Sequence, residues 1–360
     1  MKRLVLCLDG TWNRADQEHG GVPCPTNVAQ IAFRVANRAG SVVQVAYYDQ
    51  GVGTTGNLLD RFSGGAFGEG LNENIEQAYR FLIANFEPGD EIFLLGFSRG
   101  AFTARSIAGM IRKCGILKRA SIREYRAAVN LYRSADRPDT PVPMDFRQQH
   151  SVCGLDPIEI RFVGVWDTVG ALGIPLRGLR WLTRRQYQFH DTELSKSVRF
   201  AYHALAIDEH RAPFVPTLWM YKPKEGQTVD QTWFCGAHSD VGGGYAARAL
   251  SDIAMEWMVE KAQGAGLAFD EAATSAYPLR PDPRGIIHNS RRGVYRLAPG
   301  LNRPIGVAPA TAGSLNRGAP PSRDPTQSVH ASVLRRWDGD AAYRPPALAL
   351  YFKMVGDVRA

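Results

Sequence analysis

The chain has 360 residues, 44% of them hydrophobic, which is enough to bury a large core. The formal net charge of +8 comes from arginines spread along the chain. This distribution argues against a nucleic-acid-binding arm and is compatible with an anionic substrate or peripheral contact with a membrane surface. Five cysteines without a C-x-x-C pair predict neither a disulfide scaffold nor a zinc site.

The N-terminus begins with a short apolar run, Leu4 to Leu8, that predicts a buried first strand. Asp9 ends this run well short of the roughly 7–15 apolar residues in the core of a signal peptide. No stretch approaches the about 20 apolar residues of a membrane span. We therefore expect a soluble, cytoplasmic protein without a cleaved leader, and export by a specialised secretion system is compatible with the sequence.

The loop after this strand, Asp9-Gly10-Thr11, resembles the D-x-D-G-T motif of haloacid-dehalogenase phosphatases. Cys7 stands where that motif has its nucleophilic aspartate, which argues against phosphatase chemistry of that class. Asp9 is then either a residue of the active-site pocket or a carboxylate that caps the loop.

A strand is predicted at 42–48, and the letters G-x-G-x-x-G follow it at 51–56. Residues 57–70 do not form a continuous helical pattern, and no acidic residue ends a strand at the required distance, so a dinucleotide site is disfavoured. We predict instead a glycine-rich loop at the rim of the active site, with Gly53 in the pocket.

The segment from Asp90 to Arg105 carries the strongest motif. An apolar strand at 92–95 leads into Gly96-Phe97-Ser98-Arg99-Gly100, and a helical pattern follows. A strand, a turn with glycines two residues before and after a serine, and a helix make up the nucleophile elbow. The pattern predicts that Ser98 is a nucleophile above the positive end of the helix. The amides of Arg99 and of Gly10 or Thr11 would form the oxyanion hole.

Five motifs in order, LDGTWN, GVGT, GFSRGAFTAR, FVGVWDTVG and GAHSDVGGGY, resemble the domain-of-unknown-function 2235 family. This family comprises α/β-hydrolases and includes the catalytic domains of type VI secretion phospholipase effectors. The resemblance runs from Leu4 to about Arg335 and implies a serine ester hydrolase without fixing its substrate.

The predicted elements form a single domain over residues 1–360. We expect an α/β-hydrolase-like three-layer sandwich, with a mostly parallel central sheet, helices on both faces, and a small cap insertion. The cap is assigned to segments around 115–155 and 171–200. Within 189–211 we predict a helix that carries His203, followed by a structural ion-pair cluster at residues 208–211.

Two aspartates follow predicted strands after Ser98, at the sheet edge where α/β proteins build their sites. Asp240 follows the second predicted strand after the elbow strand, which is the usual position of the acid in this fold, and we favour it over the alternate, Asp167.

The general base should follow the acid, because the chain order in α/β-hydrolases is serine, acid, histidine. His288 and His330 come after Asp240. We select His330, with His288 as the alternate, and assign His238 to the pocket because it precedes Asp240.

The predicted activity is hydrolysis of a carboxylic ester through a Ser98–His330–Asp240 triad and an acyl-enzyme, without metal or cofactor. The resemblance implies a lipid or phospholipid acyl ester. Two alternatives stay open. One is a metal-dependent phosphoesterase that uses Asp9, Asp167 and Asp240, and the other is a non-catalytic binding protein on a hydrolase fold.

Overall fold

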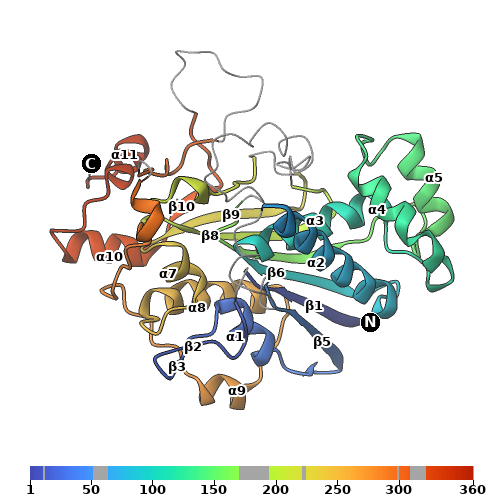
Figure 1. Cartoon of the computed structure of the whole chain (residues 1–360), viewed down its shortest axis with the longest axis horizontal. Coiled ribbons are helices and arrows are strands. Elements are labelled where there is room, and N and C mark those ends of the chain that lie inside the picture. The colour runs from blue at the N-terminus through green and yellow to red at the C-terminus, as the bar shows by residue number, and fades with distance from the viewer. Residues whose placement is uncertain are drawn as a thin grey trace.

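A mostly parallel eight-stranded sheet forms the centre of the molecule (Figure 1). The computed structural model describes residues 1–10, 13–51, 64–169, 194–220, 224–297, 300–308 and 322–359. The sheet order is β10-β9-β8-β7-β6-β1-β5-β4, and β4 is antiparallel to β5 whereas the other neighbours are parallel. The strands are β1 (Lys2–Leu8), β4 (Arg38–Ala39), β5 (Val42–Asp49), β6 (Glu91–Phe97), β7 (Ile160–Trp166), β8 (Val198–Ala206), β9 (Thr228–Phe234) and β10 (Gln327–Val329). A small hairpin pairs β2 (Glu18–His19) with β3 (Val22–Pro23).

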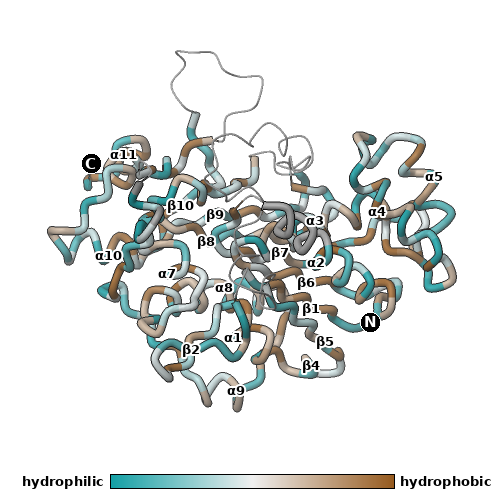
Figure 2. Tube along the Cα trace, in the orientation of Figure 1, coloured by the Kyte–Doolittle hydropathy of each residue, from teal (hydrophilic) through white to brown (hydrophobic). Residues whose placement is uncertain are grey.

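Helices cover both faces of the sheet because the central strands are apolar on both sides. In β1, Val5 and Cys7 belong to one buried cluster and Leu4, Leu6 and Leu8 to another, as the alternation of side chains along a strand requires. The first cluster includes α1 (Asn27–Arg34) and α8 (Ala249–Gly264), and the second includes α2 (Gly64–Asn85), α3 (Arg99–Cys114) and α4 (Tyr125–Arg133). Figure 2 shows the apolar strands between more polar helices. The predicted three-layer α/β fold is confirmed.

The remaining elements are an insertion after α3 and several short helices. The predicted insertion at 115–155 contains η1 (Arg119–Glu124), α4 and α5 (Pro141–His150), and both helices contact α3. Of the other predicted cap segment, 171–200, residues 171–193 lie outside the described residues. The other elements are η2 (Ala212–Phe214), α7 (His238–Gly242), α9 (Glu271–Ala276), η3 (Gly293–Leu297), α10 (Ala331–Gly339) and α11 (Pro346–Val355).

One sequence-based prediction of secondary structure is wrong. Residues 198–206 form strand β8 instead of a helix around His203, and β8 pairs in parallel with β7 and β9. Val198 and Ala201 pack into one core cluster, whereas Phe200 and Tyr202 pack against the other. Both faces of β8 are therefore buried, and β9 is the third strand after β6 instead of the second.

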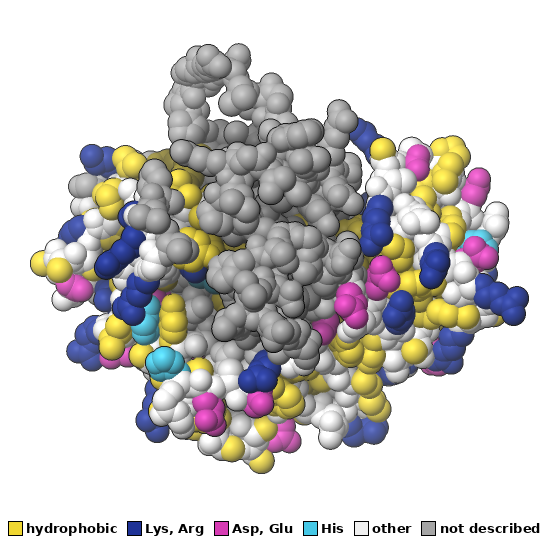
Figure 3. All heavy atoms as spheres, viewed as in Figure 1, with side chains coloured by type: hydrophobic (Ala, Val, Ile, Leu, Met, Phe, Trp, Pro, Cys, Tyr) yellow, Lys and Arg dark blue, Asp and Glu magenta, His cyan; other side chains and the backbone are white. Residues whose placement is uncertain are grey.

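Among the described residues, no helix is both long and apolar enough to cross a bilayer. All five cysteines are free, and Cys7 and Cys235 are buried as expected. Lys and Arg side chains are scattered over the face shown in Figure 3.

Candidate active site

Ser98 lies at the turn between β6 and α3, at the carboxyl edge of the sheet. Its backbone has φ 58° and ψ −118°, a left-handed conformation that is costly for a residue with a Cβ. The Ser98 N–H donates to the carbonyl of Trp166, 3.0 Å away, which ties the turn to the end of β7. Ser98 is mostly buried and directly precedes the first residue of α3.

The two glycines of the motif allow this turn to pack closely. A Cβ at Gly96 would lie 2.5 Å from the Gly100 carbonyl oxygen, and a Cβ at Gly100 would collide with the carbonyl of Leu8 at the end of β1. The backbone therefore has the strand, positive-φ serine and helix of a nucleophile elbow.

The loop after β1 lies beside Ser98, as predicted. A Cβ at Gly10 would lie 3.2 Å from Ser98 Cβ. The Gly10 N–H, however, donates to Asp9 Oδ1 at 2.7 Å. This amide is occupied, so the prediction that Gly10 is an oxyanion donor is not supported. Thr11 and Gly53, the other predicted members of this rim, lie outside the described residues.

Asp9 is a buried carboxyl at the centre of a hydrogen-bond network. Its Oδ2 accepts from Thr26 Oγ1 at 2.6 Å and from the Tyr48 hydroxyl at 2.8 Å. Burial raises the Asp9 pKa to about 6 even though these hydrogen bonds oppose the shift. The network holds the loop against Ser98, which fits the loop-capping interpretation of Asp9.

Asp167 and His238 form a buried pair next to the elbow. The Nδ1–H of His238 donates to Asp167 Oδ2 at 2.5 Å, and neither residue is more than 5% exposed. Asp167 directly follows Trp166, the residue that binds the Ser98 amide. The His238 ring lies 4.6 Å from the ring of Phe97, centroid to centroid. The loops after β7 and β9 therefore meet in this pair, next to the end of β6 that carries Phe97 and Ser98.

Asp167 also binds a buried arginine that the sequence analysis did not single out. Arg303 Nη1 donates to Asp167 Oδ1 at 2.6 Å, and Nη2 donates to Oδ2 at 3.0 Å. Burial alone would raise the Asp167 pKa, but the Arg303 charge and the His238 hydrogen bond outweigh it and hold the pKa below its ordinary value. The carboxylate therefore stays ionised.

Glu209, on the loop after β8, holds the backbone of this site. Its Oε2 accepts from the His238 N–H at 3.3 Å, and Oε1 accepts from the Ser290 hydroxyl at 2.8 Å. Arg211 forms an ion pair with it at 2.8 Å. Of the predicted ion-pair cluster at 208–211, the structure shows the pair Glu209–Arg211, whereas Asp208 accepts from the Tyr343 hydroxyl.

Asp240, the favoured acid of the sequence analysis, binds His288 and not His330. The Nδ1–H of His288 donates to Asp240 Oδ1 at 2.6 Å. Asp240 Oδ2 accepts the backbone N–H groups of Ala237 and His288, each at 2.9 Å. The carboxylate thus ties the start of α7 to the 287–290 segment.

His330 caps a helix at the edge of the sheet. Its Nδ1 accepts the Ser332 N–H at 3.3 Å at the start of α10, and its ring stacks on Phe234. β10 is four strands from β6 in the sheet order, roughly 19 Å at the usual strand spacing. The structure does not bring His330 to Ser98 or to Asp240, because its imidazole is committed to the α10 cap.

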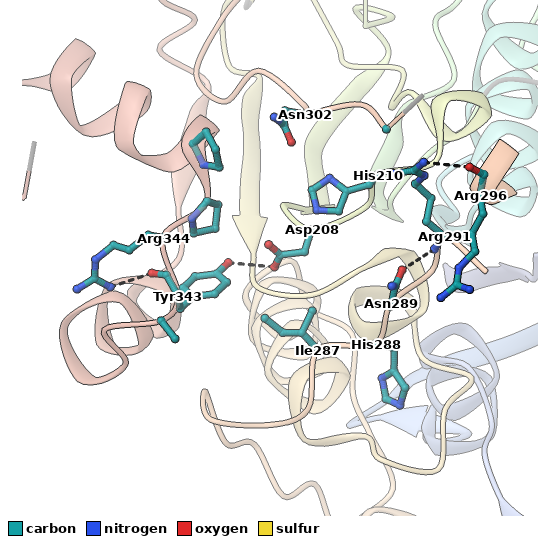
Figure 4. Close-up of a pocket in the computed structure, with 14 residues that line it drawn as sticks. Asp208, His210, Ile287, His288, Asn289, Arg291, Arg296, Asn302, Tyr343 and Arg344 are labelled. Carbon is teal, nitrogen blue, oxygen red and sulfur yellow. Dashed lines mark hydrogen bonds between the residues drawn. The ribbon is translucent and has the colours of Figure 1, made fainter. Parts of the chain in front are cut away.

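A cavity of about 810 Å³ is lined in part by His288, the hydrogen-bond partner of Asp240 (Figure 4). Asp208 lies on its wall and accepts the Tyr343 hydroxyl at 3.0 Å and the Gly236 N–H at 2.7 Å. The side chain of Arg344, which also lines it, binds carbonyls at the end of α10. Ser98 and His238 do not line this cavity.

These features define an α/β protein with a positive-φ serine directly after β6 and a buried carboxylate–imidazole pair that contacts the end of that strand. The family described as "T6SS, Phospholipase effector Tle1-like, catalytic domain" matches residues 2–261. The chain belongs to this family, which is the one that the motifs had indicated. The matched range contains Ser98, Asp167, His238 and Asp240, whereas His288, Arg303 and His330 lie beyond it.

Three individual relatives are themselves longer than the matched region. An uncharacterised protein of Saccharomyces cerevisiae is 30% identical over 236 residues, which are 59% of this chain and 32% of the yeast protein. The crystal structure of an uncharacterised protein from Pseudomonas aeruginosa has a TM-score of 0.45 and 19% identity, over 75% of this chain and 46% of that one. The Tle1 effector, in a structure bound to the VgrG spike of the type VI secretion system, has a TM-score of 0.38 and 20% identity, over 68% and 51%. The chain thus spans about a third of the yeast protein and about half of each solved chain. Since one relative is from yeast, similarity alone does not imply a bacterial source.

Proposed function

We propose that this protein is a serine hydrolase that cleaves a carboxylic ester of a lipid, with phospholipid acyl esters as the first candidates. Its triad is Ser98, His238 and Asp167. The observation that carries the proposal is the buried 2.5 Å hydrogen bond between His238 and Asp167, on loops that contact the elbow of Ser98. The substrate class rests on the family, whose description names phospholipase effectors.

This triad keeps the chain order of α/β-hydrolases and changes two of its members. Asp167 and then His238 follow Ser98 along the chain, so serine still precedes acid and acid precedes histidine. The predicted acid and base, Asp240 and His330, are replaced because each is bound elsewhere.

The reaction follows from the roles of the three side chains. With Nδ1–H held by Asp167, His238 Nε2 takes the proton of Ser98 as Oγ bonds to the ester carbonyl carbon. The tetrahedral intermediate collapses, and the departing alcohol takes that proton from His238. A water molecule then attacks the acyl-enzyme by the same route, which releases the carboxylic acid and restores Ser98.

Negative charge on the carbonyl oxygen is stabilised at the start of α3. The Arg99 N–H is the first amide of this helix, where backbone donors and the helix dipole favour an anion. A second donor has to come from a group other than the Gly10 amide, since that amide binds Asp9.

The metal-dependent alternative fits the described residues poorly. A guanidinium occupies both oxygens of Asp167, and Asp240 accepts three N–H donors. Within the described ranges, no three His, Cys, Asp or Glu side chains are placed to hold a metal ion. The proposal therefore predicts hydrolysis that survives EDTA.

The test compares wild type with Ser98→Ala on p-nitrophenyl esters and on phospholipid vesicles. Ser106→Ala is the matched control, because Ser106 is also buried and lies on α3. Wild type and Ser106→Ala should hydrolyse esters and bind a fluorophosphonate probe covalently, and Ser98→Ala should do neither. Equal hydrolysis by Ser98→Ala would reject the serine mechanism, and absence of labelling in wild type would favour a non-catalytic binding protein.

A further inference from the structure

Arg303 is a cation buried at the carboxylate of the proposed triad. It is 1% exposed and lies in the segment 300–308, beyond the range matched by the family. Besides its two bonds to Asp167, it donates to the carbonyls of Ala206 at 2.8 Å and Phe214 at 2.5 Å. Burial of a guanidinium is costly unless its charge and its donors are matched, so this placement is specific.

We infer that Arg303 is a positioning residue that sets the basicity of His238 through Asp167. The inference rests on the proposed triad. It assigns a role in the reaction to the part of the chain that follows the family match.

The geometry restricts the carboxylate to one orientation. Asp167 Oδ1 accepts from Arg303 and from the Ala206 N–H at 3.1 Å, and Oδ2 accepts from Arg303 and His238. Rotation of the carboxylate would break several of these bonds at once. His238 Nδ1 therefore meets the same oxygen at each turnover, and Nε2 is kept as the basic nitrogen.

The guanidinium of Arg303 is oriented so that its two Nη groups bind Asp167 and its Nε does not. Arg303 Nε is buried and has no hydrogen-bond partner in the described structure. Both Nη groups, by contrast, are fully used. A lysine would bring a single ammonium and no fork, so it would preserve the charge without the bidentate geometry.

The charge of Arg303 also lowers the stabilisation that Asp167 gives to a protonated imidazole. The charged groups packed around His238 are Asp167, Glu209, Arg211 and Arg303, with Asp240 on its own helix. Burial lowers the pKa of His238, and the Asp167 hydrogen bond and charge oppose this shift. Because the charge of Asp167 is already neutralised by Arg303, Asp167 raises the His238 pKa less than an unpaired carboxylate would. His238 therefore stays unprotonated, and able to accept a proton, at lower pH.

The test measures protonation of His238 directly, in the full chain labelled with nitrogen-15 histidine. The His238 signal is assigned by its loss in His238→Gln. In Arg303→Gln, His238 should bind a proton about tenfold more tightly, a pKa rise of about one unit, and Arg303→Lys should give a smaller rise. The control is Arg147→Gln, since Arg147 is also buried and binds backbone carbonyls, but far from the site on α5.

The activity readout follows the same logic. The rate of fluorophosphonate labelling should fall on the acidic side in Arg303→Gln and recover at alkaline pH, where His238 is neutral in both proteins. An Arg303→Gln protein that loses thermal stability as Arg147→Gln does, with an unchanged or lower His238 pKa, overturns the inference. If Arg303→Gln does not fold, the His238 pKa is measured in Arg303→Lys instead, and an unchanged or lower value there overturns the inference.

Failure of this inference can be separated from failure of the proposed function. Wild type that labels at Ser98, together with an unmoved His238 pKa in the Arg303 variants, rejects the role of Arg303 and keeps the hydrolase. Wild type that does not label rejects the hydrolase, and with it the inference that rests on the triad.

Discussion

Two carboxylate–imidazole pairs lie close together in this protein, and by hydrogen-bond length they are nearly indistinguishable. Asp167 and His238 are joined at 2.5 Å, and Asp240 and His288 at 2.6 Å. His238 and Asp240 even belong to the same short helix, α7. A short contact between a carboxylate and an imidazole is therefore not enough to identify a general base.

The two pairs differ in the other groups that contact their imidazoles and carboxylates. The imidazole of His238 contacts Phe97, the neighbour of Ser98, whereas His288 stacks on Tyr245 at 4.0 Å. Asp167 binds a guanidinium that lowers its pKa against the effect of burial, while Asp240 binds backbone amides and burial raises its pKa. The first arrangement maintains a charged acid beside a base, and the second joins two loops.

The largest expected effect separates the two imidazoles. His238→Gln should reduce kcat/KM by roughly 10⁴- to 10⁶-fold, because the base that accepts the Ser98 proton is lost. His288→Gln, the matched variant of the other pair, should stay within about tenfold of wild type. Ester hydrolysis at neutral pH measures both. The reverse ranking would transfer the catalytic role to the Asp240–His288 pair.

Replacement of the two aspartates should also reduce activity more in the Asp167–His238 pair than in the Asp240–His288 pair, by a smaller factor than replacement of the histidines. Asp167→Asn should lower kcat about 10⁴-fold, since the amide no longer holds the correct tautomer of His238. Asp240→Asn should mainly lower the free energy of unfolding, by about 1–3 kcal/mol, because it loses an acceptor for backbone N–H groups. Kinetics and urea unfolding of both variants distinguish these outcomes, and comparable catalytic losses would contradict the comparison.

A third buried carboxyl, Asp9, shows by comparison what the Arg303 cation does to the pKa of Asp167, because the hydrogen-bond donors to Asp9 are neutral. Its pKa is raised to about 6 from 3.8, so folded protein holds a proton that unfolded protein has released between these values. The contribution of Asp9 to the free energy of unfolding is therefore greatest below pH 3.8, and it falls by about 3 kcal/mol as the pH rises through 6.

Asp9→Asn should remove this dependence. The difference in unfolding free energy, variant minus wild type, should increase by about 2–3 kcal/mol from pH 4 to pH 7. Chemical unfolding of both proteins across this range gives the difference directly, and groups that titrate equally in both cancel. A flat difference would mean that Asp9 is ionised throughout.

The strand, turn and helix around Ser98 were predictable because their signal is local. Gly96, Ser98 and Gly100 lie within five residues, and the backbone constraint at each follows from that spacing. The layer order was likewise predictable, since short apolar runs such as Leu4 to Leu8 are typical of the central strands of a parallel sheet that helices cover on both faces.

The proposed acid and base, Asp167 and His238, were not predictable in this way, because the assignment of these roles depended on counting strands. Reading 198–206 as a helix removed β8, which made the strand before Asp240 the second after the elbow and excluded His238 by chain order. The β-branched and aromatic residues Val198, Phe200 and Tyr202 were the signal for a strand. Arg303 had no such signal, since its partner is 136 residues away in the chain.

His330 provides the smallest expected effect and the most direct check on the proposed assignment. His330 caps α10, so its replacement by alanine should lower the free energy of unfolding by about 1 kcal/mol. Replacement by asparagine, which also caps helices, should lower it by less. Neither variant should alter kcat/KM by more than about twofold, because the cap is four strands from the elbow strand. Thermal unfolding and ester hydrolysis measure the two quantities separately. A large loss of activity in His330→Asn with an unchanged melting temperature would return His330 to the reaction, and no rearrangement of α10 alone would account for it.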